Sequence, residues 1–178
     1  MTKQKQHDIE QILKDRALEL SEVSADETLD DDSIEIVEFV LSYEKYGIES
    51  RFVDEVYPMK DYTTVPGTPP FVLGIINLRG TILSIIDIRK FFDLPVKGLS
   101  NLNRVIVVRT PYMELGIISD FILGVRRIPR KAIQSSLPTL TGIRAKYLHG
   151  LTEEGLVILD VEKIVTDPEI VVNDEIEA

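Results

Sequence analysis

The sequence contains no cysteine and only two histidines, His7 and His149. Without cysteine there are no disulfide bonds and no thiolate chemistry, and the compartment we expect is most simply the cytoplasm. The histidines lie far apart in the chain, and neither an HExxH motif nor an EF-hand run is present. The sequence therefore predicts no metal site.

Long apolar runs are also missing. No run reaches the ~20 residues that a membrane-spanning helix requires, and the short apolar stretch Ile82–Ile86 is interrupted by Ser84. The polar N-terminal residues lack the apolar segment of a signal peptide. We therefore expect no direct insertion into a membrane.

Signatures of catalysis and phosphate binding are scarce. Gly74 and Gly80 flank a stretch that matches neither the P-loop nor the dinucleotide-binding fingerprint. Asp87 and His149 are the remaining candidates for a catalytic role, but an Asp before an apolar helical turn is more often a helix cap. The sequence predicts no catalytic residue and no cofactor, which favours a protein that is not an enzyme.

Acidic charge is concentrated at the two ends of this 178-residue chain. The net charge is −10, of which residues 1–35 carry −7 and residues 167–178 carry −5, while residues 36–166 carry +2. Affinity for nucleic acid depends on neutralising phosphates, so an acidic chain is a poor candidate for such binding. We expect no nucleic-acid partner, an acidic N-terminal extension, a nearly neutral domain over residues 36–166 and an acidic C-terminal tail.

The N-terminal extension contains one helical pattern. Within residues 5–20, Ile9, Ile12, Leu13 and Leu20 recur at helical spacings, and an acidic linker over residues 21–32 follows. The helix could bind a partner on a tether or cover one side of the body, and the pattern leaves both interpretations open.

From Ile34 onwards the apolar residues favour short strands and turns. A bend is expected near Phe52, a rigid loop over Thr63–Pro70 with three prolines, and single helical turns capped by Asp87 and Asp160. The expected strands are Ile34–Ser42, Tyr46–Val56, Gly74–Leu78, Thr81–Asp87, Arg104–Thr110, Met113–Ser119, Phe121–Ile128, Tyr147–Thr152 and Leu156–Leu159.

A weak internal repeat organises these strands. The residues Gly47-Ile48, Phe52-Val53 and Val56 recur as Gly116-Ile117, Phe121-Ile122 and Val125, and the set Gly74-Ile75, Gly80 and Asp87 is echoed by Gly150-Leu151, Gly155 and Asp160. Two halves of about five short strands each point to two small β-barrels packed side by side, with a groove between them.

Arg79 is the most informative charged residue. It lies with Gly80 between two β-rich runs, and an arginine among buried strands needs a carboxylate or a cluster of backbone carbonyls as its partner. The sequence pattern favours Glu55 as that partner. The pair is expected to act as an internal brace, as a docking element, or as both.

The pattern of motifs resembles the CheW family of chemotaxis coupling proteins. The similarity covers about residues 36–166 and includes a long NLRG element with flanking prolines and a following IDxR. The matching segments are YGIESRFVDEV (46–56), TTVPGTPPFVLGIINLRGTILSIIDIRKFF (63–92), RVIVV (104–108), LGIISDFILGV (115–125) and YLHGL…LVILDVEKIV (147–165).

The resemblance implies two five-stranded SH3-like β-barrel subdomains and a non-enzymatic adaptor. It implies coupling of the cytoplasmic tips of methyl-accepting chemotaxis receptors to the regulatory domain of the histidine kinase CheA, in arrays at the inner face of the membrane. A coupling protein of a non-flagellar pathway, with pili or a second messenger as output, is the alternative.

The resemblance also implies roles for five residues of this sequence. Glu55 and Arg79 match positions linked with receptor coupling, and Val53, Val105 and Val125 match apolar positions that line a receptor-facing groove. Each valine could instead belong to the core. The acidic extension and Ser84, where the family usually has proline, are departures from the family pattern.

Overall fold

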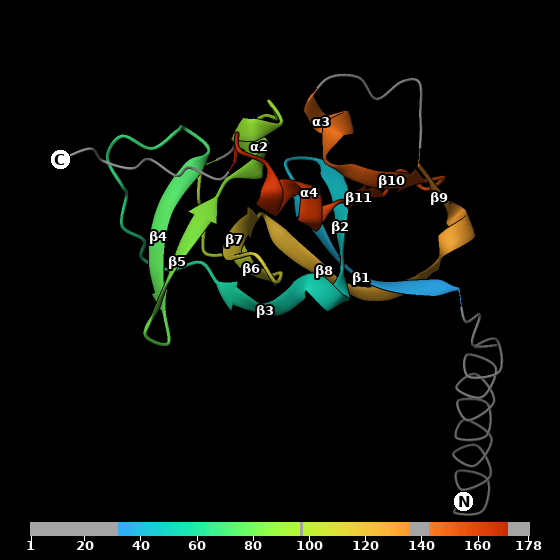
Figure 1. Cartoon of the computed structure of the whole chain (residues 1–178), viewed down its shortest axis with the longest axis horizontal. Helices are drawn as coiled ribbons and strands as arrows, with labels where there is room; N and C mark the ends of the chain where they lie inside the picture. Colours follow the sequence, from blue (N-terminus) through green and yellow to red (C-terminus); the bar gives the residue numbers. More distant parts are fainter. Residues whose placement is uncertain (1–31, 97, 136–142, 171–178) are drawn as a thin grey trace, which may run out of the picture. The chain divides into compact units, whose positions relative to one another are not determined.

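The computed structural model describes residues 32–96, 98–135 and 143–170, whose strands form two sheets (Figure 1). The first sheet has the spatial order β3 (Val53–Pro58), β6 (Arg104–Arg109), β7 (Glu114–Ser119), β5 (Thr81–Ile86) and β4 (Val72–Leu78). The second has the order β8 (Phe121–Pro129), β1 (Ser33–Leu41), β2 (Glu44–Glu49), β11 (Val157–Leu159), β10 (Leu148–Thr152) and β9 (Ile133–Gln134).

Short helical segments join the strands. They are the 3-10 turns η1 (Ser50–Phe52) and η2 (Arg130–Ala132) and the helices α2 (Ile88–Phe91), α3 (Ile143–Lys146) and α4 (Val161–Thr166). The bend expected near Phe52 is η1, which separates β2 from β3. The prediction of a mainly β fold with two SH3-like barrel subdomains is confirmed, with a sixth strand of only two residues, β9, added to the second.

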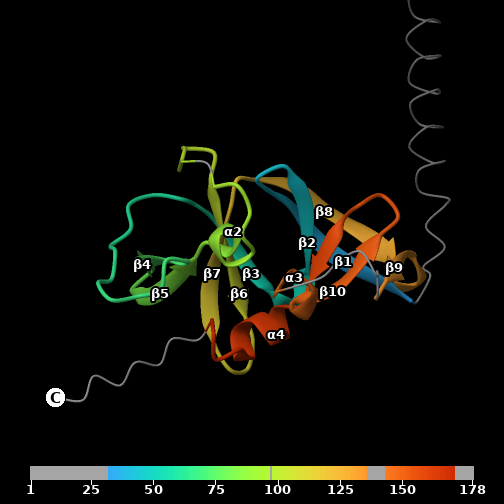
Figure 2. The ribbon, with the colours of Figure 1, turned by 90° about the horizontal axis from the view of Figure 1, so that it is seen from above.

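The two subdomains do not coincide with the two halves of the internal repeat. The chain passes from β2 through η1 into β3 of the five-stranded sheet, and from β7 through Asp120 back into β8 of the six-stranded sheet (Figure 2). The parallel pairs β5–β7 and β11–β2 occupy equivalent places, with Ile85 opposite Gly116 and Ile158 opposite Gly47. Each sheet therefore contains strands from both halves, an exchange that the repeat by itself did not reveal.

Two equivalent glycines allow a neighbouring segment to approach the sheet strand closely. A Cβ atom at Gly74 would lie 2.2 Å from the carbonyl oxygen of Thr63, and one at Gly150 would lie 2.8 Å from that of Gln134. Thr63 forms a β-bridge with Ile75, so the proline-containing loop is fastened to β4. Close backbone approach therefore requires glycine at Gly74 and Gly150.

The two predicted helix caps are confirmed. Asp87 accepts a hydrogen bond from the backbone N–H of Arg89 at the start of α2, and Asp160 accepts one from Lys163 at the start of α4. An Asp at this position satisfies backbone donors that the first helical turn leaves without a partner. The recurrence of the cap in both halves agrees with its structural role.

The largest apolar cluster is shared by the two sheets, so the subdomains form one folded body. Smaller clusters lie inside the five-stranded sheet, around Ile85 and Val105, and inside the six-stranded sheet, around Ile36 and Ile158. The shared cluster includes Phe39, Leu41, Tyr46, Ile48, Ile86, Ile88, Phe92, Ile106, Val108, Ile117, Tyr147, Leu159, Val161 and Ile164.

Several sequence predictions lie outside the described residues. They are the helix over residues 5–20, His7, nearly all of the acidic linker and the tail after Ile170. Contacts divide the chain into two units, one ending at Ser33 and one beginning at Ile34. In the described ranges, no helix is long and apolar enough to cross a membrane.

Candidate docking surface

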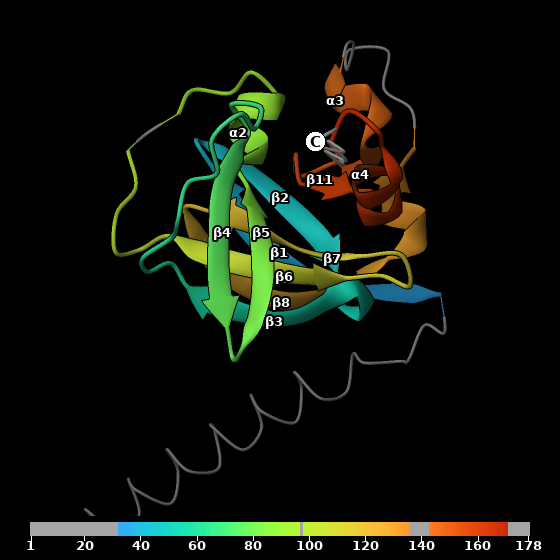
Figure 3. The same cartoon turned by 60° about the vertical axis from the view of Figure 1, so that its left-hand side comes forward.

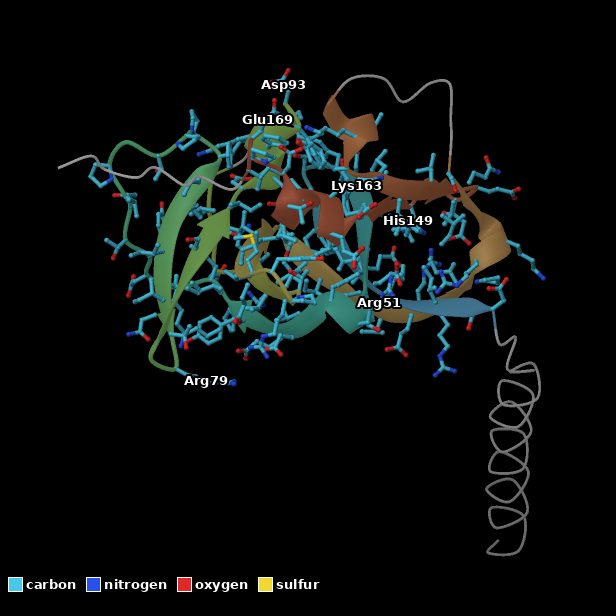
Figure 4. All side chains as sticks on the ribbon, viewed as in Figure 1. Arg51, Arg79, Asp93, His149, Lys163 and Glu169 are labelled. Atoms are coloured by element: carbon cyan, nitrogen blue, oxygen red, sulfur yellow. The ribbon has the colours of Figure 1, made fainter. Side chains whose placement is uncertain are left out.

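Glu55 and Arg79 meet at the surface of the five-stranded sheet. Arg79 occupies the tip of the β4–β5 hairpin, where its backbone has a φ of 52°, and Glu55 lies in β3 (Figures 3 and 4). The Nη2 atom of Arg79 donates a hydrogen bond to Oε2 of Glu55 at 2.8 Å. Since β3 and β4 are the two end strands of this sheet, the pair connects its ends across the barrel.

This ion pair is exposed, whereas the sequence argument had placed Arg79 among buried strands. The side chain of Arg79 is 78% exposed and that of Glu55 is 22% exposed. Exposed pairs contribute only ~0–1 kcal/mol, because water screens the attraction and two long side chains lose rotamer freedom. The fold therefore depends little on Arg79, whose guanidinium remains accessible to a partner protein.

The three valines named from the resemblance lie in different environments. Val105 is fully buried in the cluster of the five-stranded sheet, where it lines a small pocket with Tyr57 and Ile76. Val53 is half-buried at the start of β3 and packs against the shared cluster. Val125 is 60% exposed in β8. Of the two interpretations left open for each valine, core packing fits Val105, and groove lining is compatible with the exposure of Val125. Receptor contact by these valines stays a prediction.

Strand β8 carries an apolar row that sequence reasoning identified only at Val125. Phe121, Leu123 and Val125 alternate along this edge strand, and all three side chains are exposed. The intervening Ile122 packs against the shared cluster. Residues i, i+2 and i+4 of a strand lie on one face, so the sequence spacing already placed these three side chains together. The spacing does not show which face of the strand other elements cover.

We define the docking surface as Glu55, Val56 and Arg79 together with the apolar row Phe121, Leu123 and Val125. Strands β3 and β8 lie on the same lower side of the body in Figures 1 and 3. Val56 of β3 is exposed and corresponds to Val125 in the internal repeat. Exposed apolar side chains beside a polar rim are typical of a protein interaction site.

Ion pairs also connect strand β3, which carries Glu55 and Val56, to β6 and through it to β7 of the five-stranded sheet. Arg109 of β6 pairs with Asp54 of β3 at 2.9 Å and with Glu114 of β7 at 3.3 Å. The hydrogen bond with Glu114, followed by the charge of Asp54, raises the pKa of Arg109 above its ordinary value. These contacts cross the β3–β6–β7 ladder on its exposed side.

The six-stranded sheet carries a counterpart of the surface ion pair with the charges reversed. Arg126 of β8 donates to Glu154, which lies in the turn between β10 and β11, at 2.9 Å. Glu55 and Arg79 connect a strand and a hairpin turn in the same way, but there the acid is on the strand. Both sheets therefore have an ion pair between a strand and a hairpin turn, but the positions of the acid and the base are exchanged.

A second arginine, Arg89, forms the buried ion cluster that sequence reasoning sought at Arg79. Its guanidinium is completely buried and binds both carboxylate oxygens of Asp87, with Nε–Oδ1 at 2.8 Å and Nη2–Oδ2 at 2.9 Å. Its third nitrogen, Nη1, donates to Asp120. Hydrogen bonding to Asp87 raises the pKa of Arg89. The IDIR spacing was visible in the sequence, but its burial was not.

The candidates for chemistry have structural or exposed positions. The carboxylate of Asp87 is occupied by Arg89 and by the cap of α2, and His149 is exposed on β10 (Figure 4). Within the described part of the chain, no group of three or more His, Cys, Asp or Glu side chains is placed to hold a metal ion. The arrangement of the docking surface suits binding to another protein.

Comparisons with known proteins agree with this class, a β-rich docking module. The chain matches the CheW-like domain family over residues 35–169 and belongs to that family. It is 33% identical to the chemotaxis protein CheW of Treponema pallidum, covering 80% of this chain and 88% of that protein. It is 31% identical to protein PilI of Pseudomonas aeruginosa, covering 56% of each chain.

A solved structure supports the assignment of fold. The scaffolding protein TtCheW from Thermoanaerobacter tengcongensis has a TM-score of 0.65 and 33% sequence identity, covering 71% of this chain and 88% of that one. The relatives are scaffold and adaptor proteins of the CheW type.

Proposed function

We propose that this protein couples methyl-accepting chemotaxis receptors to the histidine kinase CheA. The observation that carries the proposal is the exposed apolar row of β8 in a body that belongs to the CheW family. A receptor's cytoplasmic tip is a helical hairpin, which presents apolar residues at i, i+3 and i+4 to such a surface. Arg79 and Glu55 supply a polar edge that fixes the orientation of the helices.

The second partner is the regulatory domain of CheA, and no chemical step is involved. The protein works by holding two other proteins at fixed separation, on the cytoplasmic side of the membrane. Each contact buries a small apolar area and is weak, so an array of alternating copies gains its strength from multivalency. Residues 1–35 and 167–178 add acidic segments around the proposed adaptor domain, residues 36–166.

Co-sedimentation with a receptor signalling fragment and a CheA-type kinase tests this function. Val125→Asp places a charge in the apolar row and is expected to abolish receptor-dependent sedimentation. Leu102→Asp is the matched control, because Leu102 is also 60% exposed but lies in the loop between α2 and β6. Equal losses for the two variants, or none for either, would contradict the proposed surface.

Arg79→Ala tests the polar edge separately. The variant is expected to fold normally, since the pair with Glu55 is exposed, and to weaken receptor-dependent activation of the kinase. Normal activation by the folded variant in a reconstituted kinase assay would show that Arg79 has no part in docking.

The similarity to PilI favours a second candidate, a coupling protein of a non-flagellar chemosensory pathway. The docking surface would be the same and the partners would differ. Pull-down of this protein against a panel of receptors and kinases from both kinds of pathway discriminates the two. Repeating it without residues 1–35 shows whether the acidic extension contributes to the choice.

A further inference from the structure

We propose that Asp120 is a positioning residue, which with Arg89 fixes β8 relative to the five-stranded sheet and so sets the geometry of the docking surface. Its effect on partner binding rests on the proposed function, whereas its effect on geometry does not. Asp120 lies outside the docking surface as defined above, so it acts through the strand that follows it.

The contacts of Asp120 reach both sheets. On the side of the six-stranded sheet, its backbone N–H donates to the carbonyl of Val40, and its Oδ2 accepts from the N–H of Ser42 at 2.6 Å. On the other side, its Oδ1 accepts from Arg89 at the start of α2 and from Nδ2 of Asn103 before β6. One carboxylate therefore joins the end of β1 to α2, which follows β5, and to the residue before β6.

The cluster is charged and largely buried, so its geometry is specific. Asp87 and Asp120 share one guanidinium, and they also accept hydrogen bonds from the backbone N–H groups of Ser42 and Arg89 and from the side-chain amide of Asn103. Arg89 and Asp87 are almost inaccessible to solvent. A planar guanidinium with three fixed bonds tolerates little displacement of its partners, because each lost bond leaves a buried charge unsatisfied.

The chain passes between the two sheets twice, from β2 to β3 and from β7 to β8. Only the β7–β8 crossing has an aspartate in a buried polar cluster, here called the anchor, at the equivalent position. In the internal repeat, Phe121 corresponds to Phe52, so Asp120 corresponds to Arg51. Arg51 is exposed, pairs with neighbouring Glu49 at 3.0 Å, and lies over the ring of Phe52. The β7–β8 crossing thus carries a buried polar cluster, whereas the side chain of Arg51 makes local contacts at the β2–β3 crossing.

The place of the anchor explains its consequence for docking. Asp120 immediately precedes the row Phe121, Leu123 and Val125, so a shift at Asp120 moves the whole row. The hairpin that carries Arg79 leads through β5 to Asp87 and Arg89. The same cluster is therefore connected by short rigid segments to both parts of the docking surface.

A distance measurement without any partner tests the geometric claim. Because the chain has no cysteine, Thr81→Cys in the hairpin and Leu123→Cys in β8 can carry the only two spin labels. Asp120→Asn, in an otherwise identical labelled protein, is expected to broaden or shift the label-to-label distance distribution. Asp167→Asn is the control, since Asp167 is also buried and binds Tyr147 and Lys146 elsewhere in the body.

A distribution for Asp120→Asn that equals the wild-type distribution would overturn the proposal, as would an equal change in Asp167→Asn. Asp120→Asn retains the size and one oxygen acceptor of the side chain, and circular dichroism checks that it folds. If it does not fold, Asn103→Ala is measured in its place, because this change removes one uncharged donor to the same carboxylate. A distance distribution equal to that of the wild type would then overturn the proposal in the same way.

Binding of the unlabelled protein to a receptor-tip fragment supplies the second measurement. Asp120→Asn is expected to bind about tenfold more weakly than Asp167→Asn, a loss of about 1.4 kcal/mol. Failure of the wild-type protein to bind would refute the proposed function, while the distance measurement would still decide the role of Asp120. Equal binding by the two variants would contradict positioning by Asp120.

Discussion

Two arginines of this chain, ten residues apart, are expected to differ sharply in their contribution to stability. Arg79 is 78% exposed and pairs with one carboxylate that is 22% exposed, whereas Arg89 is completely buried and pairs with two carboxylates. Replacing either arginine by alanine removes the same side chain and the same charge. The comparison therefore isolates the effect of burial on an ion pair.

The expected magnitudes follow from these environments. Arg89→Ala leaves Asp87 and Asp120 without their guanidinium in a largely buried site, which costs about 3–5 kcal/mol. Arg79→Ala breaks an exposed pair and costs at most about 1 kcal/mol. With a urea dependence of about 2 kcal/mol per molar, the unfolding midpoint falls by about 2 M for Arg89→Ala and by about 0.5 M or less for Arg79→Ala.

Urea unfolding followed by circular dichroism measures both values. Arg89→Lys is a useful third variant, because a lysine keeps the charge but cannot bond both oxygens of Asp87 while reaching Asp120. We expect its midpoint to lie between those of the wild type and Arg89→Ala. Equal midpoints for Arg79→Ala and Arg89→Ala would refute the reasoning, because burial would then not control the cost.

Three further predictions concern single sites. Gly74→Ala is expected to lower the thermal midpoint, since its Cβ would meet Thr63 in a backbone with a φ of +147°, whereas Gly98→Ala meets no atom within 4 Å and is expected to be neutral. Asp160→Ala removes a helix cap and is expected to cost about 1 kcal/mol in urea unfolding; an unchanged midpoint would argue against the cap. Burial, and then the bond to Asp167, raises the pKa of Tyr147 to about 12. The stability from this neutral phenol is complete below pH ~10 and is lost as the pH rises towards about 12, so Tyr147→Phe should remove the highest tyrosine transition in an ultraviolet titration.

The sequence was most informative where local chemistry determines local structure. Asp87 and Asp160 were identified as caps, and the bend near Phe52 was anticipated, because each depends on a few neighbouring residues. The internal repeat was also visible, and two of its glycines, Gly74 and Gly150, lie where a Cβ atom would meet backbone. The partner of Arg79 was named from the pattern of strands, and Glu55 lies within hydrogen-bond distance of it.

The sequence was least informative about burial. Val105 and Val125 have the same side chain and both lie in strands, yet one is fully buried and the other is 60% exposed. The sequence pattern predicted that Arg79 lies among buried strands and gave no sign that Arg89 is buried. In the structure, Arg79 is exposed and Arg89 is completely buried. Which face of a strand is covered depends on elements that are distant in sequence, and the alternation of side chains is the same in either case.

The sequence by itself determined the class of fold, the caps, the turns and the family, because these follow from residue types at short spacing. Only the tertiary structure decided that the sheets exchange strands between the two halves, that Asp120 joins them, and that Phe121 and Leu123 extend an apolar row from Val125. The physical reason is that these features arise from contacts between segments far apart in the chain, whose free energy depends on what each segment covers.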